Sequence, residues 1–201
     1  MSSDAIAHLR HADPVLAGLI DQVGSYLLER REASFAALVR AIVGQQISTA
    51  AAATIDRRLR DLTGDPPTPD ALLSLDDEAL RGAGLSRSKQ VAVRELALRA
   101  LEGDLDIGSL ADLDDEAVVA TLTRSRGIGR WTAEMYLIFA LGRPDVLPIG
   151  DLGFRNAVRR AYGDTVEHSP SGLMALGERW RPYRSVATWY LWRSLALPPR
   201  D

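Results

Sequence analysis

The hydrophobic positions in the first half of the chain follow a helical period. From residue 35 onward, apolar residues recur at steps of three and four, which places them on one helix face: Phe35, Leu38, Val39, Ile42, Val43 and Ile47. Ala50 to Ala53 and Ile55 continue this face toward Leu62. Turn and proline residues from Thr63 to Pro69 then end it. The pattern predicts one long helix from Phe35 to Leu62.

The rest of the chain is also typical of helices. Apolar periodicity predicts further helices over residues 75–80, 86–101, 115–123 and 152–162. No segment shows the sustained alternation of a half-buried strand. Val146 to Ile149 is apolar, but Pro148 interrupts it, so we expect a connecting segment there. The predicted fold class is all-α, with about ten helices in one compact domain or in two interleaved lobes.

Composition places the chain among globular proteins. It is 46% hydrophobic and 25% charged. No apolar run approaches the roughly 18 residues that a membrane span needs. The absence of cysteine excludes disulfides and thiolate metal sites, and the first residues carry neither a basic nor an apolar stretch. We therefore expect a soluble intracellular protein.

Basic charge is concentrated in one stretch, although the whole chain has a net charge of −3. Residues 124–160 contain seven arginines against three acidic residues, a balance of +4. A locally basic face is compatible with phosphate binding, and a solvated arginine-rich surface is the alternative. Of the 24 basic residues only Lys89 is a lysine, so a mechanism that needs a lysine nucleophile has a single candidate.

The most specific motif is Gly127-Ile128-Gly129, which lies between two helical sequences. Glycine permits a tight turn with positive φ and lets backbone N–H groups approach an anion. The start of the following helix, expected over residues 130–140, adds its partial positive charge. An ordinary helix C-cap is the alternative for the glycines alone. The whole string from Leu122 to Ala133 predicts a hairpin that holds phosphate without reading sequence.

At these residues the chain resembles the helix-hairpin-helix DNA glycosylases, and among them the 3-methyladenine DNA glycosylase II branch. The segments that carry the resemblance occur in the family's order: 41–48, 84–89, the hairpin with Trp131, 147–153 and 180–192. The resemblance implies the compact form without an N-terminal β-lobe. It also implies a middle lobe of about residues 37–142 that carries the hairpin, a second lobe formed by residues 1–36 and 143–201, and a cleft between the lobes.

The resemblance places the essential carboxylate at Asp151. Breaking an N-glycosidic bond develops positive charge on the sugar, which a fixed carboxylate stabilises, and the carboxylate also serves to orient water. Asp151 precedes the apolar helix of residues 152–162, so a helix N-cap is the alternative, and the two roles are compatible. Trp131 stands where strand-cleaving relatives carry their nucleophilic lysine, and Lys89 lies in another segment. We therefore expect a monofunctional glycosylase with no lyase activity, whose product is an abasic site.

The base pocket is expected to be aromatic. Alkylated purines such as 3-methyladenine and 7-methylguanine are cationic, and an aromatic face attracts a cation. The resemblance assigns Trp131 and Trp192 to this pocket, with Trp189 as a further candidate whose alternative is a core position. Met135 replaces the family's usual tyrosine, which removes a stacking surface and a hydroxyl and leaves the range of bases open.

A base reaches such a pocket by flipping out of the duplex, and a side chain must fill the gap. The resemblance assigns this role to Gln46, because the segment from Gly44 to Ser48 matches the one that supplies the intercalating side chain in relatives; a solvent-facing helix position is the alternative. The expected DNA contacts are Gln45, Gln46, Lys89, Gly127, Ile128, Gly129, Arg130 and Thr132. No cofactor is expected to be required, but the backbone carbonyls of Thr123, Ser125 and Ile128 match a family site for Na⁺ or K⁺.

These observations predict a monomeric enzyme of base excision repair that excises alkylated purines from double-stranded DNA. Its expected location is the cytoplasm, with the nucleoid, in a bacterium, or the nucleus in a eukaryote. A non-catalytic helix-hairpin-helix protein that only binds DNA is the main alternative, and a helical scaffold without affinity for DNA is a second one.

Overall fold

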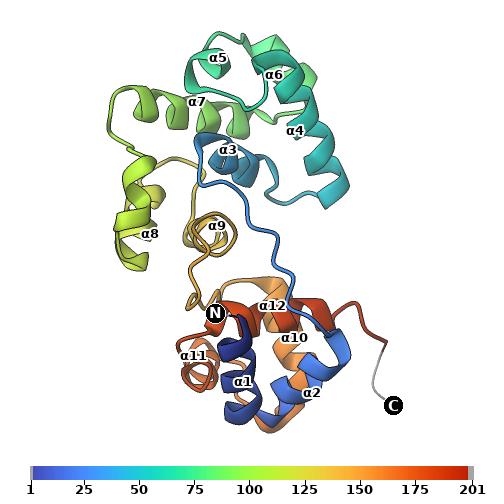
Figure 1. Cartoon of the computed structure of the whole chain (residues 1–201). Helices are drawn as coiled ribbons and strands as arrows, with labels where there is room; N and C mark the ends of the chain where they lie inside the picture. The colour runs from blue at the N-terminus through green and yellow to red at the C-terminus, as the bar shows by residue number, and fades with distance from the viewer. Residues whose placement is uncertain (1, 199–201) are drawn as a thin grey trace. The chain divides into compact units, whose positions relative to one another are not determined.

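The structure is a computed structural model that describes residues 2–198, and all of its regular elements are helical (Figure 1). This range contains twelve α-helices, two 3-10 segments, one π-helical segment and no strand. The all-α prediction is confirmed. The helices are α1 (Ser2–Ala12), α2 (Pro14–Val23), α3 (Phe35–Val43), α4 (Thr49–Thr63), α5 (Pro69–Leu73), α6 (Asp77–Ala83), α7 (Arg87–Leu101), α8 (Asp115–Thr123), α9 (Arg130–Tyr136), α10 (Leu152–Tyr162), α11 (Pro170–Glu178) and α12 (Arg184–Ser194).

The chain divides into two compact units. Residues Met1–Glu29 and Gly142–Asp201 form one, here called the terminal unit, and Arg30–Leu141 forms the other, the middle unit. None of the helices in residues 2–198 combines the length and the apolar character of a membrane span.

The terminal unit is built around α12. This helix packs against α2 and α10, and eight of its eleven residues are buried. A helix that is covered on nearly all sides needs apolar residues all round rather than on one face. The core around it includes Leu16 of α2, Phe154 of α10 and Trp180, which follows α11.

Asp13 is a buried carboxylate in this core, with only 1% of its surface exposed. Its Oδ1 caps α2 by accepting the N–H groups of Val15 and Leu16 at 2.9 and 3.2 Å. Its Oδ2 accepts the Tyr162 hydroxyl at 2.8 Å and the Trp180 indole N–H at 3.0 Å. Burial and the adjacent Asp13 charge raise the pKa of Tyr162. Four donors on one carboxylate offset the cost of burying the charge and join α2 to the segments that carry Tyr162 and Trp180.

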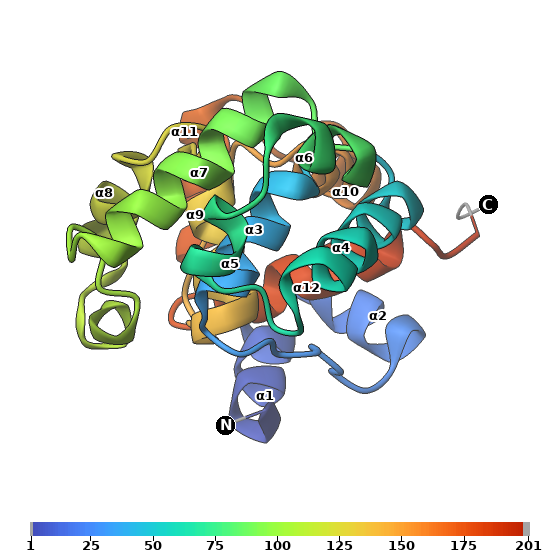
Figure 2. The same cartoon turned by 90° about the horizontal axis from the view of Figure 1, so that it is seen from above.

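The middle unit is organised around α3, which packs against α4, α7 and α9 (Figures 1 and 2). Five of its nine residues are buried at the predicted spacing, from Phe35 to Val43. Ser34 caps its first turn by accepting the N–H of Ala37 at 3.3 Å. The periodicity of this segment therefore identified the central helix of the unit.

The prediction of one helix from Phe35 to Leu62 is wrong, because the helix stops at Val43 and restarts at Thr49. Gln46 between them has a φ of 58°, in the left-handed region that interrupts a right-handed helix. Ser48 then caps α4 by accepting the N–H of Ala51 at 3.2 Å. The apolar pattern crosses this loop without a change in period, so it could not show the break.

Replacing Asp13 with Asn tests the buried carboxylate. The amide has one acceptor oxygen, so either the first turn of α2 or the Tyr162 and Trp180 pair loses its acceptor. We expect the free energy of unfolding to fall by about 2–3 kcal/mol, as measured by urea denaturation followed by tryptophan fluorescence. Ser169→Ala, which removes the cap of α11 in the same unit, is the control and should cost about 1 kcal/mol. An equal loss in both variants would contradict a special role for Asp13.

Candidate functional site

The loop between α3 and α4 is held to the rest of the middle unit by two polar side chains. The Gln45 side-chain amide donates to the Gly127 carbonyl at 2.7 Å and to the Thr132 hydroxyl at 3.0 Å. The Lys89 ammonium group donates to the Val43 and Gln45 carbonyls at 2.7 and 2.9 Å. Partial burial lowers the pKa of Lys89. Gln45 and Lys89, both expected to contact DNA, thus make intramolecular bonds that fix this loop.

Gln46 lies at the tip of the loop and is exposed. Its left-handed backbone conformation costs about 1–3 kcal/mol for a residue other than glycine. Such a conformation persists only where contacts of the neighbouring residues hold the backbone in place. The bonds made by Gln45 and Lys89 on the preceding residues supply that constraint. The Gln46 side chain is therefore presented to solvent from a loop that is held in place.

The hairpin between α8 and α9 contains two glycines. Only the first, Gly127, has the positive φ that the sequence predicts. Gly127 has a φ of 80°, and a Cβ atom there would lie 2.8 Å from the Ala92 Cβ. Glycine is therefore required at this position both by the backbone and by the close approach of α7. Ile128 is 4% exposed and belongs to the buried apolar core of the chain.

Gly129 has an ordinary extended backbone, with a φ of −89°, and it precedes α9 without a side-chain cap. A Cβ atom there would meet nothing within 4 Å. The first N–H groups of a helix have no partner within the helix, and here no side chain of the capping residue supplies one. This end of α9 therefore offers backbone donors beside open space. Its helix is shorter than expected, because the α-helix ends at Tyr136 and continues as a π-helix over Leu137–Leu141.

The other residues of the hairpin are engaged within the middle unit. Arg130 makes a two-point ion pair with Glu116, at 2.9 and 2.6 Å, which raises the pKa of Arg130 and lowers that of Glu116. Thr132 is buried, and the Thr123 hydroxyl donates to the Val119 carbonyl. The Ser125 hydroxyl accepts from Arg99, and the Ser125 carbonyl accepts the Ile128 N–H at 3.1 Å. One of the three carbonyls expected at a cation site is thus already hydrogen-bonded, and residues 2–198 contain no cluster of His, Asp or Glu that could hold a metal ion.

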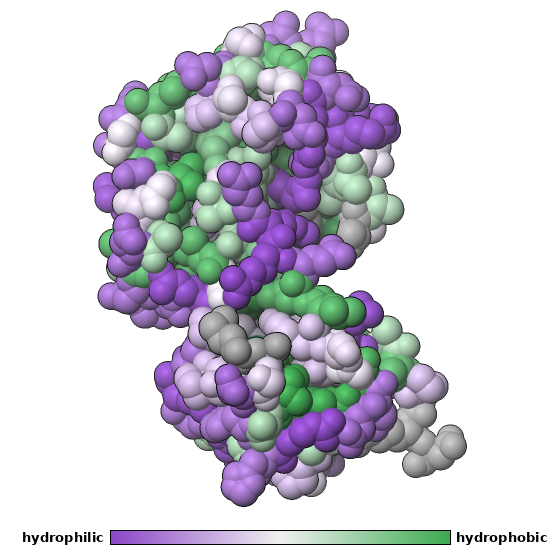
Figure 3. All heavy atoms as spheres, viewed as in Figure 1, coloured by the Kyte–Doolittle hydropathy of each residue, from purple (hydrophilic) through white to green (hydrophobic). Residues whose placement is uncertain are grey.

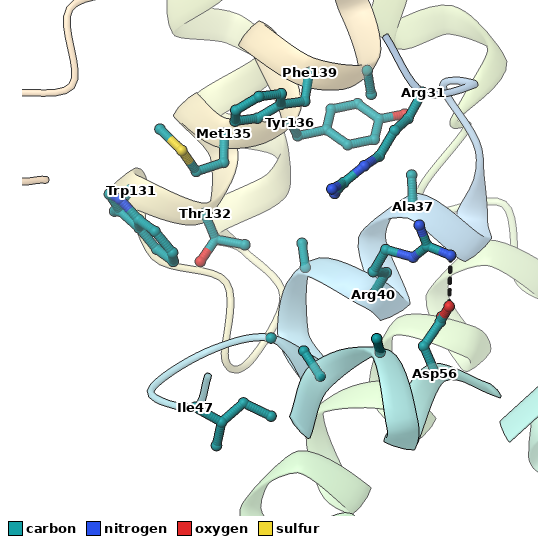
Figure 4. Close-up of a pocket in the computed structure, with 15 residues that line it drawn as sticks. Arg31, Ala37, Arg40, Ile47, Asp56, Trp131, Thr132, Met135, Tyr136 and Phe139 are labelled. Carbon is teal, nitrogen blue, oxygen red and sulfur yellow. Dashed lines mark hydrogen bonds and ion pairs between the residues drawn. The ribbon is translucent and has the colours of Figure 1, made fainter. Parts of the chain in front are cut away.

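A pocket of about 500 Å³ lies in the middle unit between α3, α4 and α9 (Figure 4). Three side chains of the α9 segment line one wall: Trp131, Met135 and Phe139 follow one another at four-residue steps. Trp131 is 39% exposed, which is unusual for so large an apolar side chain. Two of the expected base-pocket residues, Trp131 and Met135, therefore share a pocket, and Phe139 extends its aromatic wall.

The other end of this pocket is polar and basic. Arg40 pairs with Asp56 at 2.5 Å, and Arg60 reaches the same oxygen of Asp56 at 3.0 Å. Burial raises the pKa of Asp56, and Asp65 adds to this while Arg31 opposes it. Figure 3 shows hydrophilic side chains gathered over the part of the middle unit where α4 carries its charged residues.

Sequence reasoning missed Arg31, Tyr136 and Phe139 as pocket residues. Tyr136 follows Met135 directly, so an aromatic ring is present beside the position where the family's tyrosine is absent. Burial raises its pKa to about 12. The four-residue step from Trp131 through Met135 could have indicated Phe139. No sequence signal distinguishes Arg31 from its neighbours, because the contact with Phe139 joins segments more than a hundred residues apart.

Asp151 lies in the terminal unit at the N-cap of α10. Its Oδ1 accepts the Phe154 N–H at 2.6 Å and the Trp192 indole N–H at 2.7 Å. A Cβ atom at Gly153 would lie 3.1 Å from that oxygen and 3.4 Å from the Trp192 ring, so glycine leaves room for the pair. The structure therefore brings together two of the expected site residues, Asp151 and Trp192, and shows that Asp151 does cap its helix.

Trp189 occupies a different environment in the same unit. It is 8% exposed and packs edge-to-face against Tyr26 and Tyr190, with both ring centroids at 4.9 Å. The Arg193 guanidinium covers it at 5.8 Å from the ring centroid. This placement favours the core position that was the alternative for Trp189.

Replacing Lys89 with Met tests the loop support. The Val43 and Gln45 carbonyls lose a charged donor, so we expect a loss of about 1–3 kcal/mol in the free energy of unfolding. Amide hydrogen exchange at residues 45–47 should become faster, as measured by mass spectrometry. Arg87→Met, an exposed change on the same helix, is the control and should alter neither quantity measurably. Unchanged exchange in the Lys89 variant would show that the loop does not depend on this side chain.

Comparison with known proteins agrees with the family resemblance. Residues 39–182 match the family described as "HhH-GPD superfamily base excision DNA repair protein". The chain is 34% identical over 199 residues to DNA-3-methyladenine glycosylase 1 of Schizosaccharomyces pombe, an alignment that covers 94% of this chain and 86% of that protein.

Two solved structures are similar over nearly the whole chain. A Bacillus halodurans DNA-3-methyladenine glycosidase has 35% identity and a TM-score of 0.85, with 98% of this chain and 92% of that chain covered. The Schizosaccharomyces pombe 3-methyladenine DNA glycosylase in complex with abasic DNA has 32% identity and a TM-score of 0.86, with 98% and 99% covered. The chain therefore belongs to the HhH-GPD superfamily of base excision DNA repair proteins, in the branch of the 3-methyladenine DNA glycosylases.

Proposed function

We propose that this DNA glycosylase hydrolyses the N-glycosidic bond of alkylated purines in double-stranded DNA, with Asp151 as its catalytic carboxylate. The observation that carries the proposal is the double hydrogen bond on Asp151 Oδ1, from the Phe154 N–H and the Trp192 indole. Two donors on one oxygen hold the carboxylate in a single orientation. A carboxylate fixed in this way is suited to stabilise positive charge without reorganising during the reaction.

The chemistry follows from the substrate. When the bond from the sugar to an N-alkylated purine breaks, its electron pair neutralises the cationic base, and positive charge develops on the sugar. The Asp151 carboxylate stabilises that charge and orients the water that adds to the sugar carbon. The products are the free base and an abasic site.

The pocket of the middle unit supports the choice of base. Trp131 presents a large aromatic face that is partly exposed, and Met135 and Phe139 extend the apolar wall. Cationic purines are attracted to such a face, and their weakened glycosidic bond needs few further contacts. We assign this wall to the stacking of the extruded base.

Binding of DNA phosphate is assigned to the hairpin. The uncapped N-terminus of α9 after Gly129 provides backbone donors and the partial positive charge of a helix start. Gln46, on its supported loop, is the side chain assigned to fill the gap left by the flipped base. Na⁺ or K⁺ on the carbonyls of Thr123, Ser125 and Ile128 stays a prediction, and no step of the reaction depends on it.

Replacing Asp151 with Asn is the decisive experiment. Asn is as good a helix N-cap as Asp, so the fold should survive while the negative charge is lost. We expect base release from duplex DNA that contains 7-methylguanine to fall by about 10²–10³-fold with DNA binding retained. Asp114→Asn, the same change at the cap of α8, is the control and should keep full activity.

Equal activity of the Asp151 variant and the unchanged protein would overturn the role of Asp151. If the unchanged protein binds DNA but releases no base, the alternative of a non-catalytic DNA-binding protein is the correct one. Binding should weaken steeply as salt rises, because phosphate contacts release counterions.

The absence of a lyase step has its own test. Trp131 cannot form a Schiff base, and the Lys89 ammonium group is bonded to the Val43 and Gln45 carbonyls. We expect borohydride to trap no covalent enzyme–DNA product and the abasic strand to stay intact until alkali is added. A trapped product that Lys89→Met abolishes would contradict the monofunctional mechanism.

A further inference from the structure

Arg31 reaches into the pocket of the middle unit from the segment before α3. Its backbone N–H donates to the Phe139 carbonyl at 2.8 Å, which anchors the residue beside the π-helical segment. Its guanidinium lies 5.7 Å from the Phe139 ring centroid and points toward the middle of the pocket (Figure 4). Within residues 2–198, no carboxylate lies within ion-pair distance of this guanidinium. Its five N–H donors therefore face a space that a ligand can enter.

The surrounding charges make this end of the pocket positive. The charged residues that line the pocket are Arg31, Arg40 and Asp56. Asp56 already pairs with Arg40 and with Arg60, which also pairs with Asp65, so Arg31 acts on Asp56 only at longer range, where it lowers the pKa of that carboxyl. A cationic base gains nothing from an arginine and is repelled by it. A neutral base with exposed oxygen and nitrogen acceptors gains hydrogen bonds from the same group.

Tyr136 adds a second observation at the same end. It is 2% exposed, and its hydroxyl has no hydrogen-bond partner. A buried hydroxyl without a partner costs about 1–3 kcal/mol, and such costs are concentrated at functional sites. In Figure 4 the hydroxyl points toward the Arg31 side chain, so the two donors lie at the same end of the pocket.

We infer that Arg31, with the Tyr136 hydroxyl, is a specificity-determining residue that sets the preference for neutral oxo-purines relative to cationic purines by binding the acceptor edge of the base. Hypoxanthine is the test base, because it presents the O6 and N7 acceptors that arginine binds in guanine. The inference rests on the proposed function, since it concerns the base held in the same pocket.

The two kinds of base differ in what leaves the sugar. From a cationic 7-methylguanine, the electron pair of the broken bond produces a neutral base, which needs no donor. From neutral hypoxanthine, the same pair produces an anion. Hydrogen bonds from Arg31 to O6 and N7 stabilise this anion as it forms. Water supplies the hydroxyl group to the sugar, and its proton ends on the released base, so the reaction is balanced without a further reagent.

The test uses the full chain and two duplexes, one with a single hypoxanthine and one with a single 7-methylguanine. Release of each base is measured in single turnover with the enzyme in excess. Arg31→Met keeps the stem over Phe139 and removes the donors. We expect hypoxanthine release to fall by about 100-fold and 7-methylguanine release to change by less than about threefold. Arg30→Met, which removes a charge at the adjacent position, is the matched control and should not change the ratio of the two rates.

Tyr136→Phe removes one oxygen atom from a buried side chain. Because that oxygen lacks a partner, the melting temperature should not fall. We expect hypoxanthine release to fall by about tenfold with 7-methylguanine release unchanged. If the two rates keep their ratio in this variant, the hydroxyl has no part in recognition.

The outcomes separate this inference from the proposed function. An equal fall in both rates for Arg31→Met assigns Arg31 to DNA binding and overturns the inference. Release of 7-methylguanine but not of hypoxanthine by the unchanged protein overturns the inference alone. Release of neither base overturns the proposed function, and the inference with it.

Discussion

The N–H groups at the start of a helix need acceptors, and this protein supplies them from side chains at nearly every helix. In residues 2–198, nine of the twelve α-helices begin at a Ser, Thr or Asp whose side-chain oxygen accepts a backbone N–H: Asp13, Ser34, Ser48, Thr68, Asp76, Ser86, Asp114, Asp151 and Ser169. An all-helical chain with short connections depends on such caps, because each helix must start at a defined residue. Asp13 and Asp151 do more than cap the start of a helix. Each carboxylate also accepts an indole N–H from a distant tryptophan, at 3.0 and 2.7 Å, so the cap becomes a cross-link in one case and a candidate catalyst in the other.

The helix α9 lacks such a side-chain cap, and its start is the part of the hairpin to which we assign phosphate binding. It begins at Gly129 without a side-chain cap, and its first donors lie beside open space. The preceding Gly127 is required by its positive φ and by the approach of Ala92, so the hairpin is rigid where it packs and open where it ends. A phosphate oxygen satisfies the donors that a serine or aspartate satisfies elsewhere. The uncapped start makes α9 less stable than a capped helix, but it leaves backbone donors that can bind DNA phosphate without reading the base sequence.

The pocket of the middle unit combines two kinds of recognition that oppose each other. The wall that contains Trp131 attracts a cation, whereas the end that contains Arg31 repels one. Such a pocket suits a permissive enzyme, because different bases use different ends of it. Met135 removes an aromatic ring from the expected position, and Tyr136 and Phe139 place aromatic rings on the same segment nearby. The range of bases therefore depends on the whole lining rather than on the replaced residue.

The sequence alone determined what depends on local spacing. Apolar residues at three- and four-residue steps identified α3, the residues after Asp151 identified α10 with its bounds, and the string around Gly127 identified the hairpin. Asp151 as a helix cap was predictable for the same reason, because a cap involves residues three apart. Only the tertiary structure decided the break at Gln46, the burial of Trp189, the partner of Asp151 and the presence of Arg31 in the pocket. Each of these rests on contacts between residues far apart in the chain. A periodic pattern records which face of a helix is apolar but not which distant side chain will meet it.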